Sequence, residues 1–99
     1  MEFRHLKTFL DLCYTLNFTK TADRLQYAQS SITAQIKSLE TEFQLQLFER
    51  LGKKIVLTQA GKRFQHYAEQ MINLEEETRS SMYNYKDVGT LIIGAQESQ

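Results

Sequence analysis

The 99-residue chain contains no proline and only one cysteine, Cys13. A lone cysteine excludes an internal disulfide and a zinc site built from cysteine ligands. Cys13 falls on an apolar stripe with no basic neighbour, so we expect a small core residue and not a redox group. The chain also lacks a bilayer-spanning apolar run and a basic-then-apolar leader, so we expect no membrane association and residence in the cytosol.

Signals for catalysis and metal binding are also missing. The sequence has no glycine-rich phosphate loop, no His-Glu-x-x-His pair and no nucleophile elbow. His5 and His66 fall on different predicted helices, without metal ligands at suitable spacing. The run of acidic residues at 75–77 is typical of a solvated face. We therefore expect neither an enzyme nor a metal or cofactor site in this chain.

The formal net charge of zero hides an uneven distribution. Residues 1–64 carry ten Lys and Arg against six Asp and Glu, a net charge of +4. Residues 65–99 carry two against six, a net charge of −4. A phosphate backbone responds to the local charge, so the basic front of the chain is compatible with a nucleic-acid partner.

Three short helices are predicted in the first half of the chain. The first, ended by Asn17, has a stripe formed by Phe3, Leu6, Leu10 and Cys13 and widened by Phe9 and Leu16. The second has Thr19 as its expected N-cap, with Ala22 and Leu25 facing inward. The third repeats Ile32, Ile36, Leu39 and Phe43 at spacings of four, three and four. The connection at 27–29 gives the last two helices the spacing of a helix-turn-helix.

Residues 47–57 are predicted to form a β-hairpin that turns at Gly52. Two strands alone are marginally stable, so we expect the hairpin to lie against the helices through Phe48, Ile55 and Leu57.

Thr58 is a good N-cap for the last and longest predicted helix. A heptad seam follows it at spacings of four and three, formed by Ala60, Phe64, Tyr67, Met71, Leu74, Thr78, Ser81 and Tyr85. Over residues 59–85 this helix is about 40 Å long, more than residues 1–58 can cover, which favours pairing with a second chain. An internal packing stripe is the alternative.

Residues 90–93 resemble an unpaired strand, which indicates that the chain is the N-terminal part of a longer protein.

The third helix carries small, mostly uncharged residues opposite its apolar stripe, at Ser30, Thr33, Ala34, Lys37 and Thr41. A helix that enters the major groove of DNA needs such a slim face, because acidic side chains meet phosphates and bulky ones hold the helix off the bases. Gln29 can pair with adenine through two hydrogen bonds. Free N–H groups near Ser30 and Ser31 suit a phosphate.

Basic residues flank this face on both sides. Arg50, Lys53 and Lys54 surround Gly52 at the hairpin tip, as in an arm that reaches a DNA backbone or minor groove. Lys20 and Arg24 on the preceding helix suit backbone phosphates. Each feature alone is also explained by a solvated surface. Together they favour a winged helix-turn-helix that binds DNA. The alternative is a protein-interaction module that dimerises through the long helix without specific DNA binding.

The first 58 positions closely resemble the DNA-binding domain of the LysR-type transcriptional regulators. The matching stretches, in the same order and without gaps, are "FRHLKTFLDL", "NFTKTADRL", "AQSSITAQIKSLETEF", "LFER" and "LTQAGKRF". The resemblance continues to "GTLIIG", which looks like the first strand of an effector-binding domain. It implies a mainly α fold, with a winged helix-turn-helix at 1–58, a linker and dimerisation helix at 59–88 and the start of a missing effector-binding domain at 89–99.

The resemblance implies a bacterial, cytoplasmic regulator that binds a pseudo-palindromic promoter site in double-stranded DNA as a homodimer or tetramer. The helix-turn-helix then covers about 18–37, and the positions for base contacts are Gln29, Ser30, Ser31, Thr33 and Ala34. Backbone or minor-groove contacts fall to Lys20, Arg24, Lys37, Arg50, Gly52, Lys53 and Lys54, and the dimer seam to Phe64, Tyr67, Met71, Leu74, Thr78 and Tyr85. A small-molecule effector of unknown identity is expected for the full-length protein, whereas this chain is expected to bind DNA without ligand control.

The chain departs from the family pattern at three positions. Ser30 and Gln59 stand where the family often has proline, and Ala34 stands where it often has arginine. The first change makes the entry to the recognition helix less rigid. The third removes a common guanine or phosphate contact, so we expect a different base preference and a lower affinity.

Overall fold

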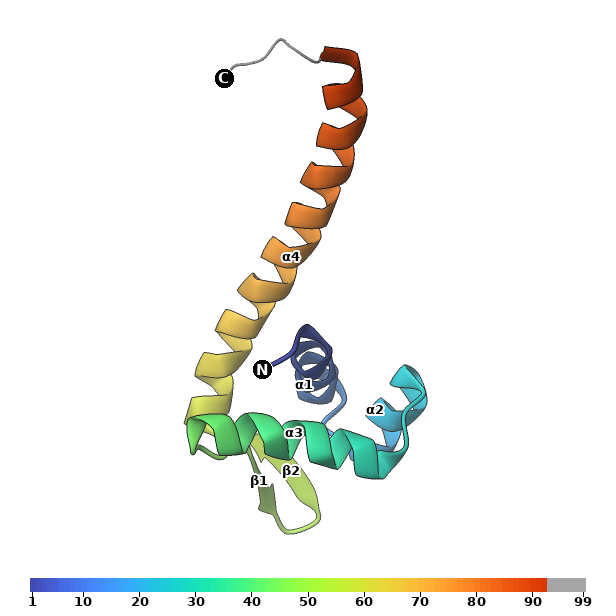
Figure 1. Ribbon diagram of the computed structural model, residues 1–99. Helices are drawn as coiled ribbons and strands as arrows, with labels where there is room; N and C mark the ends of the chain where they lie inside the picture. Colours follow the sequence, from blue (N-terminus) through green and yellow to red (C-terminus); the bar gives the residue numbers. More distant parts are fainter. Residues whose placement is uncertain (93–99) are drawn as a thin grey trace.

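The computed structural model describes the backbone of residues 1–92 and the side chains of residues 1–85 (Figure 1). Three helices come first: α1 (Phe3–Thr15), α2 (Phe18–Leu25) and α3 (Gln29–Phe43). A two-stranded antiparallel hairpin follows, β1 (Phe48–Leu51) and β2 (Lys54–Leu57), and then the long α4 (Gln59–Ile92). This order confirms the predicted winged helix-turn-helix and long helix. We call residues 1–58 the head; α4 extends away from it (Figure 1).

The core lies where α1 is covered by α2, α3 and α4. Phe9 is fully buried, and its ring centroid lies 5.4 Å from that of Phe48 in β1 and 4.9 Å from that of Phe64 in α4. One side chain thus joins the hairpin to the long helix. The buried apolar residues are Leu6, Phe9, Leu12, Ala22, Ile32, Ile36, Leu39, Leu47, Phe48, Ile55, Ala68 and Ile72.

The apolar stripe predicted on the first helix is partly wrong. Phe3 and Leu16 at its two ends are exposed, whereas Leu12, which the stripe omitted, is fully buried. Three other helices pack against α1, so its buried face is broad and centred on Phe9. The same breadth buries the polar Thr8.

Asn17, and not Thr19, caps α2. The Asn17 Oδ1 atom accepts a hydrogen bond from the backbone N–H group of Lys20 at 2.9 Å. The prediction of Thr19 was wrong because the helix begins at Phe18, which makes Thr19 part of its first turn. Both types of residue are common N-caps, so the residue types alone did not decide between them.

The hairpin predicted over residues 47–57 is confirmed. Phe48 pairs with Leu57 and Leu51 with Lys54, and Gly52 in the turn has a φ of 65°. Phe48 and Ile55 are buried, and Leu57 is partly buried against the core. The hairpin therefore lies against the helices through the expected side chains.

Thr58 caps α4 as predicted, because its Oγ1 atom accepts a hydrogen bond from the backbone N–H group of Gly61 at 2.9 Å. The next turns of α4 belong to the core, where Ala68 and Ile72 are buried. Gly61 permits this packing. A Cβ atom there would lie 2.1 Å from the carbonyl oxygen of Leu47.

The far end of α4 corrects another prediction. The helix continues through Ile92, so the strand expected from Thr90 is not observed over 90–92, and Ile93 lies outside the described residues. A helix satisfies its backbone hydrogen bonds internally, whereas a strand needs a neighbour. None of the helices described here contains an apolar stretch that could span a bilayer.

Candidate nucleic-acid interface

The outward side of α3 is open to solvent and carries short side chains. Gln29, Ser30, Thr33, Ala34 and Lys37 are exposed, and Ser31 is partly buried. The helix and the hairpin lie together at the end of the molecule opposite the far end of α4 (Figure 1). The structure therefore brings the predicted base-contacting residues and the predicted wing to one end of the head.

The inward side of α3 is less uniform than the sequence suggested. Ile32, Ile36 and Leu39 are buried as predicted, but Phe43 is 39% exposed. Between them lies Gln35, which is buried and whose Oε1 atom accepts a hydrogen bond from the hydroxyl of Thr8 at 2.6 Å. This pair fixes α3 against α1. No periodic pattern in the sequence predicts this hydrogen bond, because folding alone brings Thr8 and Gln35 together.

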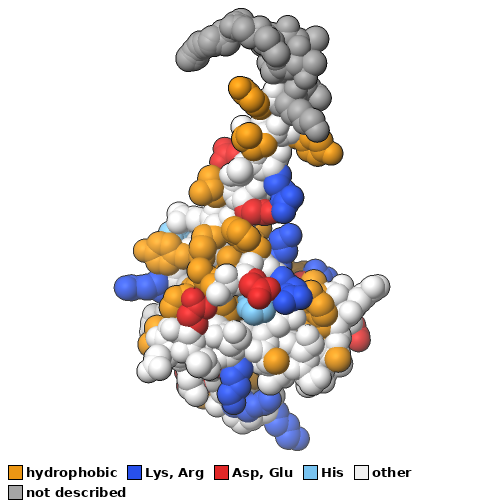
Figure 2. Space-filling model, in the orientation of Figure 1, with side chains coloured by type: hydrophobic (Ala, Val, Ile, Leu, Met, Phe, Trp, Pro, Cys, Tyr) orange, Lys and Arg blue, Asp and Glu red, His pale blue; other side chains and the backbone are white. Residues whose placement is uncertain are grey.

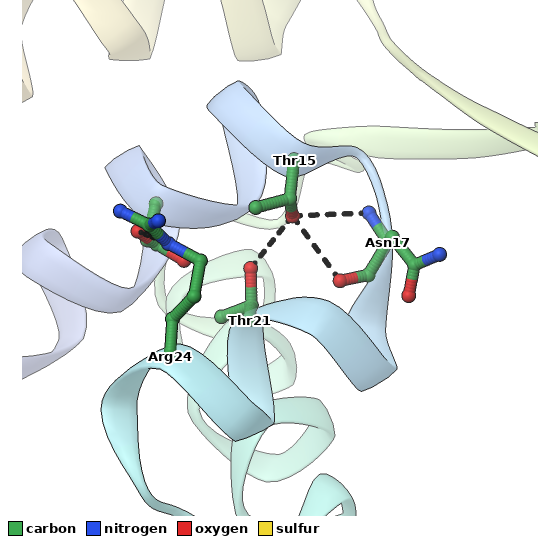
Figure 3. Close-up of polar contacts among 5 residues, drawn as sticks. Thr15, Asn17, Thr21 and Arg24 are labelled. Atoms are coloured by element: carbon green, nitrogen blue, oxygen red, sulfur yellow. Dashed lines mark hydrogen bonds and ion pairs between the residues drawn. The ribbon is translucent and has the colours of Figure 1, made fainter.

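The basic residues of α2 have different surroundings. Lys20 is exposed. Arg24 points from α2 toward α1 (Figure 3). Its Nε atom lies 2.9 Å from Asp11 Oδ1 on α1, and its guanidinium lies 5.4 Å from the ring centroid of Tyr14. Arg24 is thus held to α1 by a charge pair and a cation–π contact, so it is less free than Lys20 to reach a phosphate.

The wing presents its cations to solvent. Arg50, Lys53 and Lys54 are exposed, as is Gly52 between them. None of the ion pairs found among residues 1–85 involves these cations, Lys20 or Lys37. Lys and Arg side chains gather at this lower end of the head in Figure 2. Unpaired cations on an exposed turn are suited to phosphate oxygens.

A groove of 510 Å³ separates α3 from the hairpin. Its lining includes Thr33 and Lys37 from α3 and Arg50 from β1, together with the carboxylates of Glu40 and Glu49. Glu40 is already engaged, because its Oε2 atom accepts hydrogen bonds from the backbone N–H groups of Leu47 at 2.8 Å and Phe48 at 3.4 Å. Glu40 thus links α3 to β1, a contact that the sequence pattern did not indicate.

The predicted dimer seam divides into two parts. Phe64 and Met71 are partly buried against the core, whereas Tyr67 and Leu74 are 53% and 62% exposed. Phe43 joins them in an apolar groove of 490 Å³ beside α4. Farther along, Thr78 and Tyr85 are exposed. The head therefore covers only the first part of the seam.

Cys13 has the surroundings of a core residue. Burial raises the pKa of its thiol to about 12, and the nearby carboxylate of Glu69 adds to this shift. A thiol of this kind stays protonated and unreactive near neutral pH. Among the described residues, no three His, Cys, Asp or Glu side chains lie close enough together to hold a metal ion.

Comparison with known sequences identifies relatives along the whole chain. A model of the "Bacterial regulatory helix-turn-helix protein, lysR family" matches residues 3–62. The uncharacterized HTH-type transcriptional regulator YwqM of Bacillus subtilis is 52% identical over 100 residues, which cover 100% of this chain and 34% of that protein. The HTH-type transcriptional regulator CitR of the same species is 35% identical over 86 residues, 87% of this chain and 30% of that protein. The chain spans about a third of the length of these relatives.

Solved structures share the fold. The BenM_DBD/benA site 1 DNA complex matches with a TM-score of 0.82 and 34% identity, covering 87% of this chain and 97% of that one. The CbnR_DBD-DNA complex matches with a TM-score of 0.82 and 32% identity, covering 87% and 99%. The family model matches most of the head, and both helices of the helix-turn-helix, α2 and α3, are present. This chain therefore belongs to the lysR family of bacterial regulatory helix-turn-helix proteins.

Proposed function

We propose that this chain is the DNA-binding part of a transcriptional regulator. One observation carries the proposal: the slim, exposed side of α3 lies at the same end of the head as a hairpin tip bearing Arg50, Lys53 and Lys54. In this reading α3 enters the major groove and the hairpin contacts the backbone or minor groove. The DNA in the complexes of the similar BenM and CbnR domains supports it.

Selection of bound sequences from random double-stranded DNA tests the proposal. We expect a pseudo-palindromic site to emerge, and titrations at several salt concentrations to show tighter binding to it than to a shuffled site. Equal affinity for both at moderate salt would contradict sequence reading. Tight pairing of subunits without DNA affinity even at low salt would instead favour the protein-interaction module.

We also infer that two copies pair through α4. The exposed Tyr67 and Leu74 continue an apolar groove that the head leaves open. A Leu74→Glu variant is expected to dissociate in sedimentation experiments, whereas Asn73→Glu, an exposed neighbour outside the seam, is expected to pair normally. Truncation at Thr58 is unsuitable, because it removes Ala68 and Ile72 from the core. Wild type and Leu74→Glu both sedimenting as monomers would contradict this pairing.

For the full-length protein we propose a cytoplasmic regulator, dimeric or tetrameric, that responds to a small-molecule effector. Family membership supports this reading, although the chain covers only 34% of YwqM. Effector control would then depend on sequence beyond this chain. We propose no catalytic role.

A further inference from the structure

The first residue of α3 is held by a residue of α2. The hydroxyl of Thr19 donates a hydrogen bond to Gln29 Oε1 at 3.2 Å, across the turn between the two helices. Both side chains are exposed. Gln29 is long and flexible, whereas the β-branched Thr19 has few χ1 rotamers. The contact therefore restricts the side chain of Gln29, the first residue of α3.

Thr19 belongs to the first turn of α2, and this turn is tied to α1 by Thr15, Asn17 and Thr21 (Figure 3). The hydroxyls of Thr15 on α1 and Thr21 on α2 are 2.7 Å apart, and Thr21 is fully buried. Thr15 Oγ1 also accepts a hydrogen bond from the backbone N–H group of Asn17 at 3.1 Å, and Asn17 caps the helix. The first turn of α2 is thereby fixed to α1.

In the structure the Oε1 arm of the Gln29 amide faces Thr19. A glutamine amide has one oxygen that accepts and one NH2 group that donates twice. With Oε1 turned to Thr19, the NH2 group on the other arm of the amide points away from it. Guanine O6 and N7, adenine N7 and thymine O4 are acceptors in the major groove, and the two-bond pair with adenine also uses Oε1, which has a second lone pair.

We propose that Thr19 is a positioning residue that determines base preference by orienting the Gln29 amide, so that its NH2 group meets an acceptor on one base edge. The inference rests on the proposed function, because it concerns which base α3 reads. Thr19 acts through Gln29 and does not itself contact the base.

The test compares Thr19→Val, which keeps the shape and removes the hydroxyl, with Thr19→Ser, which keeps the hydroxyl. Binding of each is titrated against the selected site and against sites changed at single base pairs. We expect Thr19→Val to lower discrimination at one base pair about two- to tenfold, the range that one net hydrogen bond allows, and Thr19→Ser to restore it. The control Ser80→Ala removes an exposed hydroxyl on α4, away from the recognition helix, and is expected to change nothing.

Gln29→Ala completes the experiment. If Thr19 acts through Gln29, adding Thr19→Val to Gln29→Ala has no further effect on discrimination. Additive losses, or a loss of affinity that is equal for every sequence, would overturn the inference and indicate a direct phosphate contact by Thr19. A wild-type protein without base preference would contradict the proposed function instead.

A measurement without DNA tests the orienting role of Thr19 separately from the proposed function. In the free protein, the side-chain NH2 signals of Gln29 in a ¹H–¹⁵N spectrum are expected to shift in Thr19→Val and to stay near their wild-type positions in Thr19→Ser and Ser80→Ala. Unchanged Gln29 signals in Thr19→Val would overturn the orienting role, whatever the DNA titrations show.

Discussion

The carboxylate of Glu40 accepts a hydrogen bond from the backbone N–H group of Leu47 at 2.8 Å. Glu40 lies in the last turns of α3, and Leu47 immediately precedes β1. The same carboxylate oxygen is also 3.4 Å from the N–H group of Phe48. One side chain therefore ties α3 to the hairpin, so the two elements that we propose to face DNA keep a fixed relative position.

Glu40→Ala is expected to destabilise the protein by about 1–3 kcal/mol, because two N–H groups that lie partly buried lose an acceptor. Glu40→Gln keeps an acceptor and is expected to lose less. Glu42→Ala is the matched control on the same helix. Its exposed ion pair with the amino terminus is expected to contribute less than about 1 kcal/mol. Urea unfolding measures all three, and equal stabilities of Glu40→Ala and Glu42→Ala would contradict the role of Glu40.

Gly61→Ala tests the close approach of α4 to the hairpin. Helix propensity alone predicts a gain of about 1 kcal/mol for this change. We expect a loss of about 3 kcal/mol or more, because the new Cβ atom meets the Leu47 carbonyl oxygen at 2.1 Å and Leu57 Cδ2 at 2.7 Å. Gly52→Asn is the control, because asparagine tolerates its φ of 65° and no atom lies within 4 Å. A higher melting temperature for Gly61→Ala than for the wild type would contradict this close approach.

Replacing both Lys53 and Lys54 by alanine tests the wing. Both are exposed, so the fold is expected to be unaffected. Binding is expected to weaken for all DNA sequences alike, and the slope of log K against log salt to become shallower by about 1.8 if both lysines neutralise phosphates. Arg79→Ala, which removes an α4 cation paired with Glu75, is the control. An unchanged slope in the double variant would place the wing away from the DNA.

Cys13 provides a test by pH. Its folded-state pKa of about 12 exceeds the ordinary 9.0. Alkylation by iodoacetamide at pH 8 is therefore expected to be at least about tenfold slower in the folded protein than in urea. Between pH 9.0 and 12 the unfolded chain loses the thiol proton before the folded one does, so this group lowers stability as pH rises through that range. Equal alkylation rates in the two states would contradict the burial of Cys13.

Local and periodic features were predictable from the sequence. The stripe of Ile32, Ile36 and Leu39 predicted the buried side of α3, and the same spacing left its slim side exposed. Thr58 was recognised as a cap because its signal is confined to adjacent residues. The hairpin followed from β-branched residues beyond a glycine turn.

Contacts between distant residues were decided only by the tertiary structure. Thr8 and Gln35 form a buried pair although they are 27 positions apart in the sequence, and Glu40 reaches the start of a strand beyond the end of its helix. The exclusion of a side chain at Gly61 depends on a carbonyl oxygen of another element. The sequence by itself determined which elements form and which faces they bury, because helix and strand periods are set by the backbone. How those elements are joined was decided by the fold. A single polar residue shows no periodic pattern that would identify its hydrogen-bond partner, and only packing brings the two within hydrogen-bond distance.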